Sequence, residues 1–156
     1  MTRRRPRTAG RERGAELVEF ALILPLILVL IMGIFDFGLA FQRYEVVTNA
    51  AREGARLGSL ASGYQTSDIQ GRVDAYCVAA GLPGGCPATA TQNNPGVYVD
   101  KTVTIPLAGG GSQAAVQVTV IYPQRFSFLG PVMALIGGAS FGTINLRATS
   151  TMRCCG

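Results

Sequence analysis

The chain has 156 residues and no histidine, and outside its first fourteen residues it has no excess of charge of either sign. Histidine is the commonest general base and metal ligand, so its absence argues against an enzyme and against a metal site. The other 142 residues hold eight basic and eight acidic side chains, which provides no basic face for a nucleic acid. The glycine runs are not followed by Gly-Lys-Ser/Thr, the phosphate-binding pattern. We therefore expect no catalytic residues, metal, cofactor, small-molecule substrate or nucleic-acid partner.

Residues 1–14 form a basic leader in which six arginines accompany one glutamate. An apolar run of twenty-five residues follows from Leu17 to Phe41, with Glu19 and Asp36 as its only charged residues. At about 1.5 Å per residue, this run is long enough to cross the roughly 30 Å hydrocarbon core of a membrane. Because arginines favour the cytoplasmic side, we expect the leader to be cytoplasmic, residues 15–41 to form a transmembrane helix and residues 42–156 to form an exported domain.

A cleavable secretory signal is the competing interpretation of the same segment. Gly38-Leu39-Ala40 has the small residues that a signal peptidase accepts. However, the apolar run exceeds the about 7 to 15 residues of a signal peptide, and Asp36 lies between it and the cut. These two features favour an uncleaved anchor.

The helical pattern continues beyond Phe41, since apolar and small residues recur at steps of three and four from Tyr44 to Gly58. We expect one unbroken helix that leaves the membrane. Its small residues permit close approach of another helix or of a sheet: Ala50, Ala51, Gly54, Ala55 and Gly58. Two interpretations remain open, namely packing onto the chain's own domain and an interface in an assembly.

Gly14 lies five residues before Glu19, at the border between the leader and the apolar run. This arrangement resembles the processing site of type IV pilin-like proteins, in which a prepilin peptidase cuts after the glycine and leaves glutamate at the fifth mature position. The resemblance implies a cut between Gly14 and Ala15. The new amine of a neighbouring subunit would then neutralise Glu19 during assembly. The alternative is that Glu19 lies in the headgroup layer and is solvated.

A wider set of blocks carries a closer resemblance: RGAELVEFAL at 13–22, LPL at 24–26, GIFDFG at 33–38 and AAREGAR at 50–56. Together they resemble the TadE-like family of minor pseudopilins, which belong to tight-adherence (Flp-type) pilus systems. The resemblance implies a single-pass protein of the cell membrane that assists pilus assembly and enters the extracellular pilus. Its implied partners are other pilins or pseudopilins, the prepilin peptidase and the assembly platform in the membrane. The alternative is a membrane-anchored or secreted module that binds another envelope component and never enters a filament.

The exported part predicts an α+β fold with a small antiparallel sheet. Residues 67–80 have the pattern of a short helix that ends at Gly81. Alternating apolar residues over 97–105 and 116–120 predict a hairpin around the glycine-rich segment 108–112, and residues 143–152 predict a third strand. A long helix packed on such a sheet is a pilin-like arrangement.

Residues 126–141 form a second apolar stretch, which is sixteen residues long and interrupted by Gly130, Pro131, Gly137 and Gly138. It is too short to span a membrane. We expect a short helix or loop that covers the sheet, and the alternative is a patch that faces the membrane or a partner.

Cys77, Cys86, Cys154 and Cys155 all lie in the exported part, where an oxidising compartment permits disulfides. Four cysteines allow three pairings. Closure of the short loop between Cys77 and Cys86 is favoured, because it joins the predicted helix to the following loop at low entropic cost. Cys154 and Cys155 would then pair with each other or between subunits. Adjacent cysteines without histidine suit a tetrahedral zinc site poorly.

Overall fold

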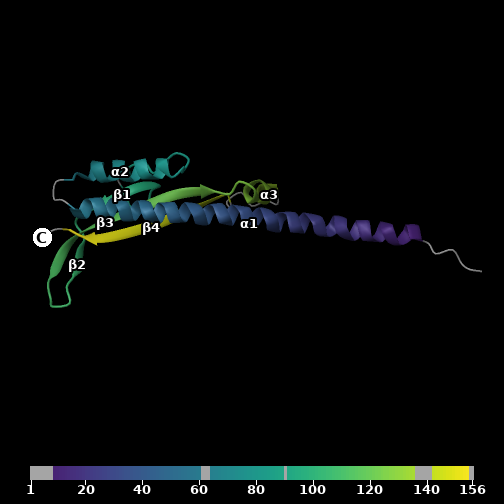
Figure 1. Cartoon of the computed structure of the whole chain (residues 1–156), viewed down its shortest axis with the longest axis horizontal. Coiled ribbons are helices and arrows are strands. Elements are labelled where there is room, and N and C mark those ends of the chain that lie inside the picture. The colour runs from purple at the N-terminus through teal and green to yellow at the C-terminus, as the bar shows by residue number, and fades with distance from the viewer. Residues whose placement is uncertain (1–8, 61–63, 90, 136–141, 155–156) are drawn as a thin grey trace, which may run out of the picture.

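A computed structural model of the chain describes residues 9–60, 64–89, 91–135 and 142–154 (Figure 1). The elements follow in the order α1 (Ala9–Leu60), α2 (Thr66–Ala79), β1 (Gly96–Asp100), β2 (Thr104–Pro106), β3 (Ser112–Arg125), α3 (Leu129–Leu135) and β4 (Thr143–Arg153). One long helix precedes a small domain with a four-stranded antiparallel sheet. This confirms the predicted α+β class.

Helix α1 is 52 residues long, which corresponds to about 78 Å at 1.5 Å per residue. It continues through Pro25 and past Phe41 without a break, as the periodicity predicts. Its C-terminal part lies along the sheet, whereas its N-terminal part projects beyond every other element (Figure 1). Among the described helices, only α1 is long and apolar enough to cross a membrane.

Strand β3 is the centre of the sheet. Val118 of β3 is opposite Val99 of β1 and Ser150 of β4, so β1 and β4 pair with opposite edges of β3. Strand β2 pairs with the first residues of β3, with Thr104 opposite Ala114. All of these pairs are antiparallel, and both the predicted hairpin and the predicted third strand are present.

The run predicted as one strand over 97–105 is divided into β1 and β2. The side chain of Asp100 accepts hydrogen bonds from the backbone N–H of Thr102 at 2.8 Å and from its hydroxyl at 2.7 Å. Such a local bond from an aspartate to the chain two residues ahead competes with a strand ladder. The interruption therefore follows from a side chain that the apolar alternation ignores.

The core lies between the C-terminal part of α1, helix α2 and one face of the sheet. Val116, Val118 and Val120 of β3 are at most 1% exposed, as alternation toward one face requires. The helices contribute further fully buried side chains: Val47, Ala50, Ala51, Ala55, Ile69, Val73 and Cys77. Helix α2 ends as predicted, because Gly81 has a φ of +77° and the N–H of Leu82 donates to the carbonyl of Cys77.

Helix α3 lies beyond the end of the sheet, beside α1 (Figure 1). The expectation that residues 126–141 cover the sheet is therefore wrong for Leu129–Leu135, which form a short helix elsewhere. Residues 136–141 of that stretch lie outside the described part of the chain. The cause is a side chain of α1, Asp36, which holds the start of α3 at this place.

Candidate membrane-anchoring and assembly region

The N-terminal half of α1 is covered by nothing else in the described chain. From Leu17 to Ile31 every large apolar side chain is at least 39% exposed. A helix that is apolar on all sides is unstable in water and requires hydrocarbon or other helices around it. This exposure is consistent with a single-pass membrane anchor.

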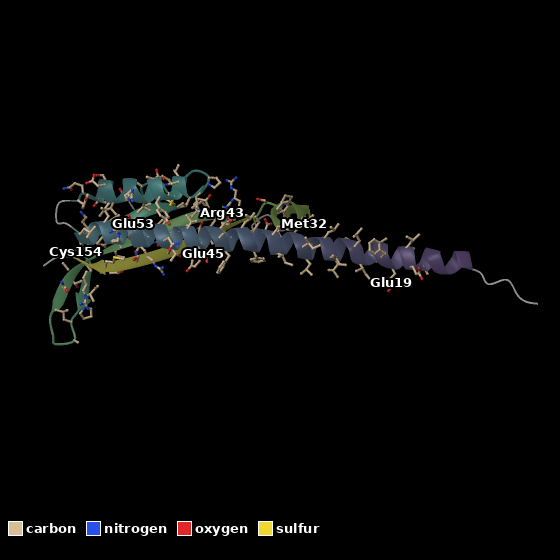
Figure 2. The ribbon with its side chains drawn as sticks, in the orientation of Figure 1. Glu19, Met32, Arg43, Glu45, Glu53 and Cys154 are labelled. Atoms are coloured by element: carbon tan, nitrogen blue, oxygen red, sulfur yellow. A yellow bond between two sulfur atoms is a disulfide. The ribbon has the colours of Figure 1, made fainter. Side chains whose placement is uncertain are left out.

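The three residues of the predicted processing and assembly site lie on consecutive turns of α1. Gly14 and Ala15 are exposed, and a side chain added at Gly14 would meet no atom within 4 Å. Glu19 is exposed one turn after Ala15, far from the sheet (Figure 2). Within the part of the chain that the structure describes, Glu19 has no hydrogen-bond or ion-pair partner. The cleavage site at Gly14 and Ala15 and the pairing role of Glu19 stay predictions.

The small residues of AAREGAR pack against the chain's own domain, which decides between the two interpretations of this segment. A Cβ atom at Gly54 would lie 2.5 Å from Val73 Cγ2 and 3.2 Å from Val118 Cγ1. At Gly58 it would lie 2.8 Å from Val116 Cγ1. Only glycine therefore allows α1 to approach α2 and β3 this closely.

The charged residues of the same motif point outward and connect α1 to α2. The guanidinium of Arg56 donates to both carboxylate oxygens of Glu53, at 3.0 and 3.2 Å. Arg72 of α2 donates to the same carboxylate at 3.3 Å. The hydrogen bonds from Arg56 and then Arg72 hold the pKa of Glu53 below its ordinary value. The motif thus places small residues inward and an ion-pair cluster outward.

Asp36 is a buried structural residue whose partners the sequence does not indicate. It is only 1% exposed, although it lies in the apolar run of α1. Its carboxylate accepts hydrogen bonds from three consecutive backbone N–H groups: Ser127 at 3.0 Å, Phe128 at 3.0 Å and Leu129 at 2.6 Å. A carboxylate that receives three donors is well compensated for its burial. Asp36 therefore fixes the turn before α3 to the middle of α1.

Two aromatic pairs lie beside this contact. The ring centroids of Phe35 and Phe128 are 6.5 Å apart, and those of Phe37 and Phe126 are 5.9 Å apart. Each pair joins α1 to the segment before α3 at a separation typical of interacting rings. Asp36 and its two phenylalanine neighbours thus contact the same short segment.

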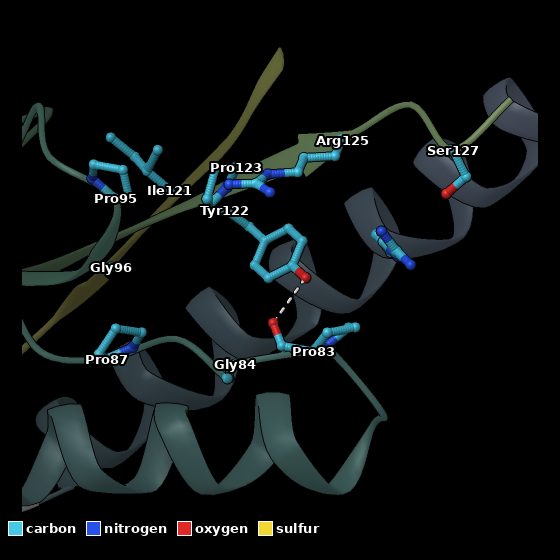
Figure 3. A pocket seen from close by; sticks show the side chains of 12 residues that line it. Pro83, Gly84, Pro87, Pro95, Gly96, Ile121, Tyr122, Pro123, Arg125 and Ser127 are labelled. Atoms are coloured by element: carbon cyan, nitrogen blue, oxygen red, sulfur yellow. Dashed lines mark hydrogen bonds between the residues drawn. The ribbon is translucent and has the colours of Figure 1, made fainter. Parts of the chain in front are cut away.

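A cavity of about 430 Å³ lies between α1, the loop after α2 and the end of β3 (Figure 3). The hydroxyl of Tyr122 donates to the carbonyl of Pro83 at 3.0 Å across it. Arg43 and Arg125 also line the cavity, and Arg43 donates to the side-chain oxygen of Gln124. The lining carries positive charge but no carboxylate, cysteine or histidine, so it offers no acid–base pair for catalysis.

Cys77 and Cys86 form the predicted disulfide, which joins α2 to the loop that follows it. Asp74 supports this loop, because its carboxylate accepts the N–H of Cys86 at 2.7 Å. The Sγ of Cys154 lies 3.5 Å from the carbonyl oxygen of Gly58, and Cys155 lies outside the described residues, so the pairing of these two stays a prediction. In the described part, no three His, Cys, Asp or Glu residues are placed to hold a metal ion.

Comparison with known proteins identifies the N-terminal part of the chain. Searches of curated proteins and of solved structures give no match. The family model of TadE-like proteins matches residues 14–56, from the glycine of the predicted processing site to the end of AAREGAR. The resemblance that the sequence blocks predict is therefore confirmed for residues 14–56, which are similar to TadE-like proteins, a family associated with tight-adherence pili.

Proposed function

We propose that this protein is a minor pseudopilin of a tight-adherence pilus, cut by a prepilin peptidase between Gly14 and Ala15. The observation that carries the proposal is Glu19, an exposed carboxylate on an apolar helix with no partner in the described chain. Charged groups within hydrocarbon are costly unless they are paired, and they usually mark function. A partner for Glu19 must then come from outside the subunit.

Cleavage would create this partner. Hydrolysis of the bond after Gly14 frees an α-amino group on Ala15, which is positively charged at neutral pH. In a neighbouring subunit displaced along the helix axis, this amine would meet Glu19 and neutralise it. The exposed apolar side chains from Leu17 to Ile31 would at the same time exchange lipid for the helices of other pilins.

The proposed topology follows from the charges at the two ends of the apolar run. The leader's arginines keep the N-terminus in the cytoplasm, where the peptidase and the assembly platform would meet it. The domain that begins after Phe41 would then lie outside the cytoplasm, in a compartment where the Cys77–Cys86 disulfide is stable. In this role the protein is a substrate and a structural subunit, and it catalyses no reaction.

The first test replaces the carboxylate by its neutral isostere, with Glu19→Gln. Membrane insertion, cleavage and the exported fold should persist, because loss of a charge from hydrocarbon is favourable, whereas piliation and crosslinks to other pilins should be lost. Glu45→Gln is the matched control, since Glu45 is an exposed carboxylate on α1 beyond the apolar run (Figure 2). Normal pilus numbers in the Glu19→Gln strain would show that Glu19 is a solvated boundary residue.

The second test is the N-terminus of the mature protein in its native host. Ala15 supports the pseudopilin, whereas Phe41 would indicate a secreted module and Met1 or Thr2 an uncleaved anchor. Gly14→Leu should retain the leader, because a bulky side chain occupies the place of glycine in the peptidase. Equal migration of Gly14→Leu and wild type on a gel would reject this processing site.

A further inference from the structure

We infer that α3 and the turn before it lie in the hydrocarbon of the membrane leaflet on the exported side, beside α1. The exported domain would then contact lipid at a second place, next to the transmembrane helix. This inference rests on the proposed membrane insertion of α1 and is independent of whether the protein enters a pilus. The occupant of the apolar surface around α3 is the acyl chains of that leaflet.

The depth of the contact follows from the helix rise. The twenty residues from Leu17 to Asp36 span about 30 Å, which is the thickness of the hydrocarbon core. With Leu17 at the cytoplasmic boundary, Asp36 lies at the exported boundary. A Cβ atom at Gly33 would lie 3.9 Å from Leu129 Cδ1, so α3 begins about one helical turn deeper than Asp36. Figure 2 shows Met32 beside α3, at the same level of α1.

The backbone before α3 is satisfied in the way that hydrocarbon requires. The N–H of Phe126 donates to the carbonyl of Gly142 at 3.2 Å, and the next three N–H groups donate to Asp36. Non-helical backbone at membrane depth needs such partners, because an unpaired N–H is costly where no water can bind it. In the first turn of α3, Pro131 has no N–H to satisfy. A turn in water would not require these partners, because water itself can accept hydrogen bonds from the N–H groups.

The side chains make one continuous apolar surface across α1 and α3. Phe35 is 60% exposed, Phe37 is 62% exposed and Phe128 is 47% exposed, although they are part of the two aromatic pairs. No charged residue occurs from Phe20 to Phe35, nor from Phe126 to Leu146. Exposed apolar surface that continues a transmembrane helix is covered most favourably by the same lipid.

Charge returns immediately on the exported side of this surface. Arg125 is exposed and precedes Phe126 directly, and Arg43 lies two turns of α1 beyond Asp36. Arginines at this position reach lipid headgroups while their stems stay over apolar surface. The apolar turn would therefore lie in the hydrocarbon, the buried carboxylate of Asp36 at its boundary, and the two arginines in the headgroup layer.

The absence of tryptophan makes a direct test available. The full chain is reconstituted in vesicles whose lipids carry bromine on the acyl chains, which quenches tryptophan only in hydrocarbon. Three single-tryptophan variants are compared: Phe128→Trp in the turn, Leu26→Trp in the middle of the span and Leu107→Trp in the exposed turn between β2 and β3. Resistance of the buried Cys77–Cys86 disulfide to a reductant without denaturant, measured by mass, reports that each variant is folded.

Phe128→Trp should show blue-shifted emission and lose intensity in brominated vesicles, as Leu26→Trp does, while Leu107→Trp should keep its intensity. Quenching of Leu26→Trp without quenching of Phe128→Trp would overturn the inference and leave the anchor intact. Absence of quenching in Leu26→Trp would overturn the proposed membrane insertion itself. If Phe128→Trp loses its disulfide, Phe126→Trp takes its place, since Phe126 belongs to the second aromatic pair.

Discussion

Helix α1 carries two carboxylates in its apolar run, and their surroundings are opposite. Asp36 is 1% exposed and accepts three backbone hydrogen bonds from the turn before α3. Glu19 is exposed and has no partner in the described chain. The charge of Asp36 is therefore compensated within the subunit, whereas the charge of Glu19 is not.

This difference separates Asp36, a residue of the fold, from Glu19, the residue proposed to act in assembly. A buried charge that the chain itself satisfies fixes the position of a segment, and its loss damages the subunit. A charge that the chain leaves unsatisfied within an apolar surface costs free energy in the isolated subunit. Under the proposed function, pairing in an assembly would recover that cost, so Glu19 would favour association without contributing to the fold.

The two halves of α1 repeat the contrast in their apolar side chains. Large apolar side chains from Leu17 to Ile31 are exposed, whereas the small residues Ala50, Ala51 and Ala55 are at most 1% exposed. The apolar side chains of the first half require lipid or neighbouring helices around them. Those of the second half are already buried against α2 and the sheet. A single helix thus presents one surface for other molecules and one for its own domain.

The largest effect should come from Asp36→Ala, because three N–H groups lose a charged acceptor together. Charge-assisted hydrogen bonds contribute about 1.5 to 3 kcal/mol each. Amide exchange at Ser127, Phe128 and Leu129 should accelerate by at least roughly 100-fold, which corresponds to about 3 kcal/mol. Hydrogen exchange with mass detection on the full chain in lipid nanodiscs measures this.

Two variants control that experiment. Asp36→Asn keeps one carbonyl oxygen as an acceptor, so its exchange rates should fall between those of wild type and Asp36→Ala. Glu19→Ala should leave the exchange of Ser127–Leu129 unchanged, because Glu19 contacts nothing there. Equal acceleration by Asp36→Ala and Glu19→Ala would remove the distinction between the two carboxylates.

A smaller effect is expected from one methyl group at Gly54. In Gly54→Ala the new Cβ would lie 2.5 Å from Val73 Cγ2, and such overpacking costs about 1 to 3 kcal/mol. Gly38→Ala is the matched control on the same helix, because its Cβ would meet nothing within 4 Å. Urea unfolding of the full chain in detergent, followed by tyrosine fluorescence, should show destabilisation only for Gly54→Ala. Equal midpoints would mean that α1 can shift away from the sheet.

The elements that rest on periodicity could be predicted from the sequence, and the contacts between distant side chains could not. The continuous α1, the end of α2 shortly before Gly81 and the three-strand alternation follow from local patterns. The sequence shows Asp36 as one of two charged residues in an apolar run, but its partners are more than ninety residues away in the chain. No spacing rule predicts that pairing, and so the position of α3 was missed.

The division of the predicted first strand has a different origin. It depends on two hydrogen bonds that Thr102 donates to the carboxylate of Asp100, which hydrophobic alternation does not record. For AAREGAR, small residues indicated close packing but not the partner, since a neighbouring helix and the chain's own sheet require the same residues. The three-dimensional contacts of Gly54 and Gly58 decide that question.

The smallest effect concerns Glu53, a third carboxylate on α1, which pairs at the surface with Arg56 and Arg72. Because these arginines lower its pKa from 4.5, the pair stabilises the fold above that pH. The contribution is lost as the pH falls through the lowered pKa of folded Glu53. Arg56→Ala should therefore reduce the free energy of unfolding at neutral pH only slightly, because solvent screens an exposed pair.

The difference between Arg56→Ala and wild type should disappear in acid, well below pH 4.5, because Glu53 is then protonated in both proteins. Arg52→Ala is the control: it removes the same charge from the same motif, and Arg52 makes no ion pair in the described part of the chain. Unfolding by urea at a series of pH values measures both. If Arg52→Ala showed the same pH-dependent difference in the free energy of unfolding, that difference would come from the loss of net charge and not from the ion pair. A difference confined to Arg56→Ala would establish Glu53 as a carboxylate compensated at the surface, between the fully buried Asp36 and the unpaired Glu19.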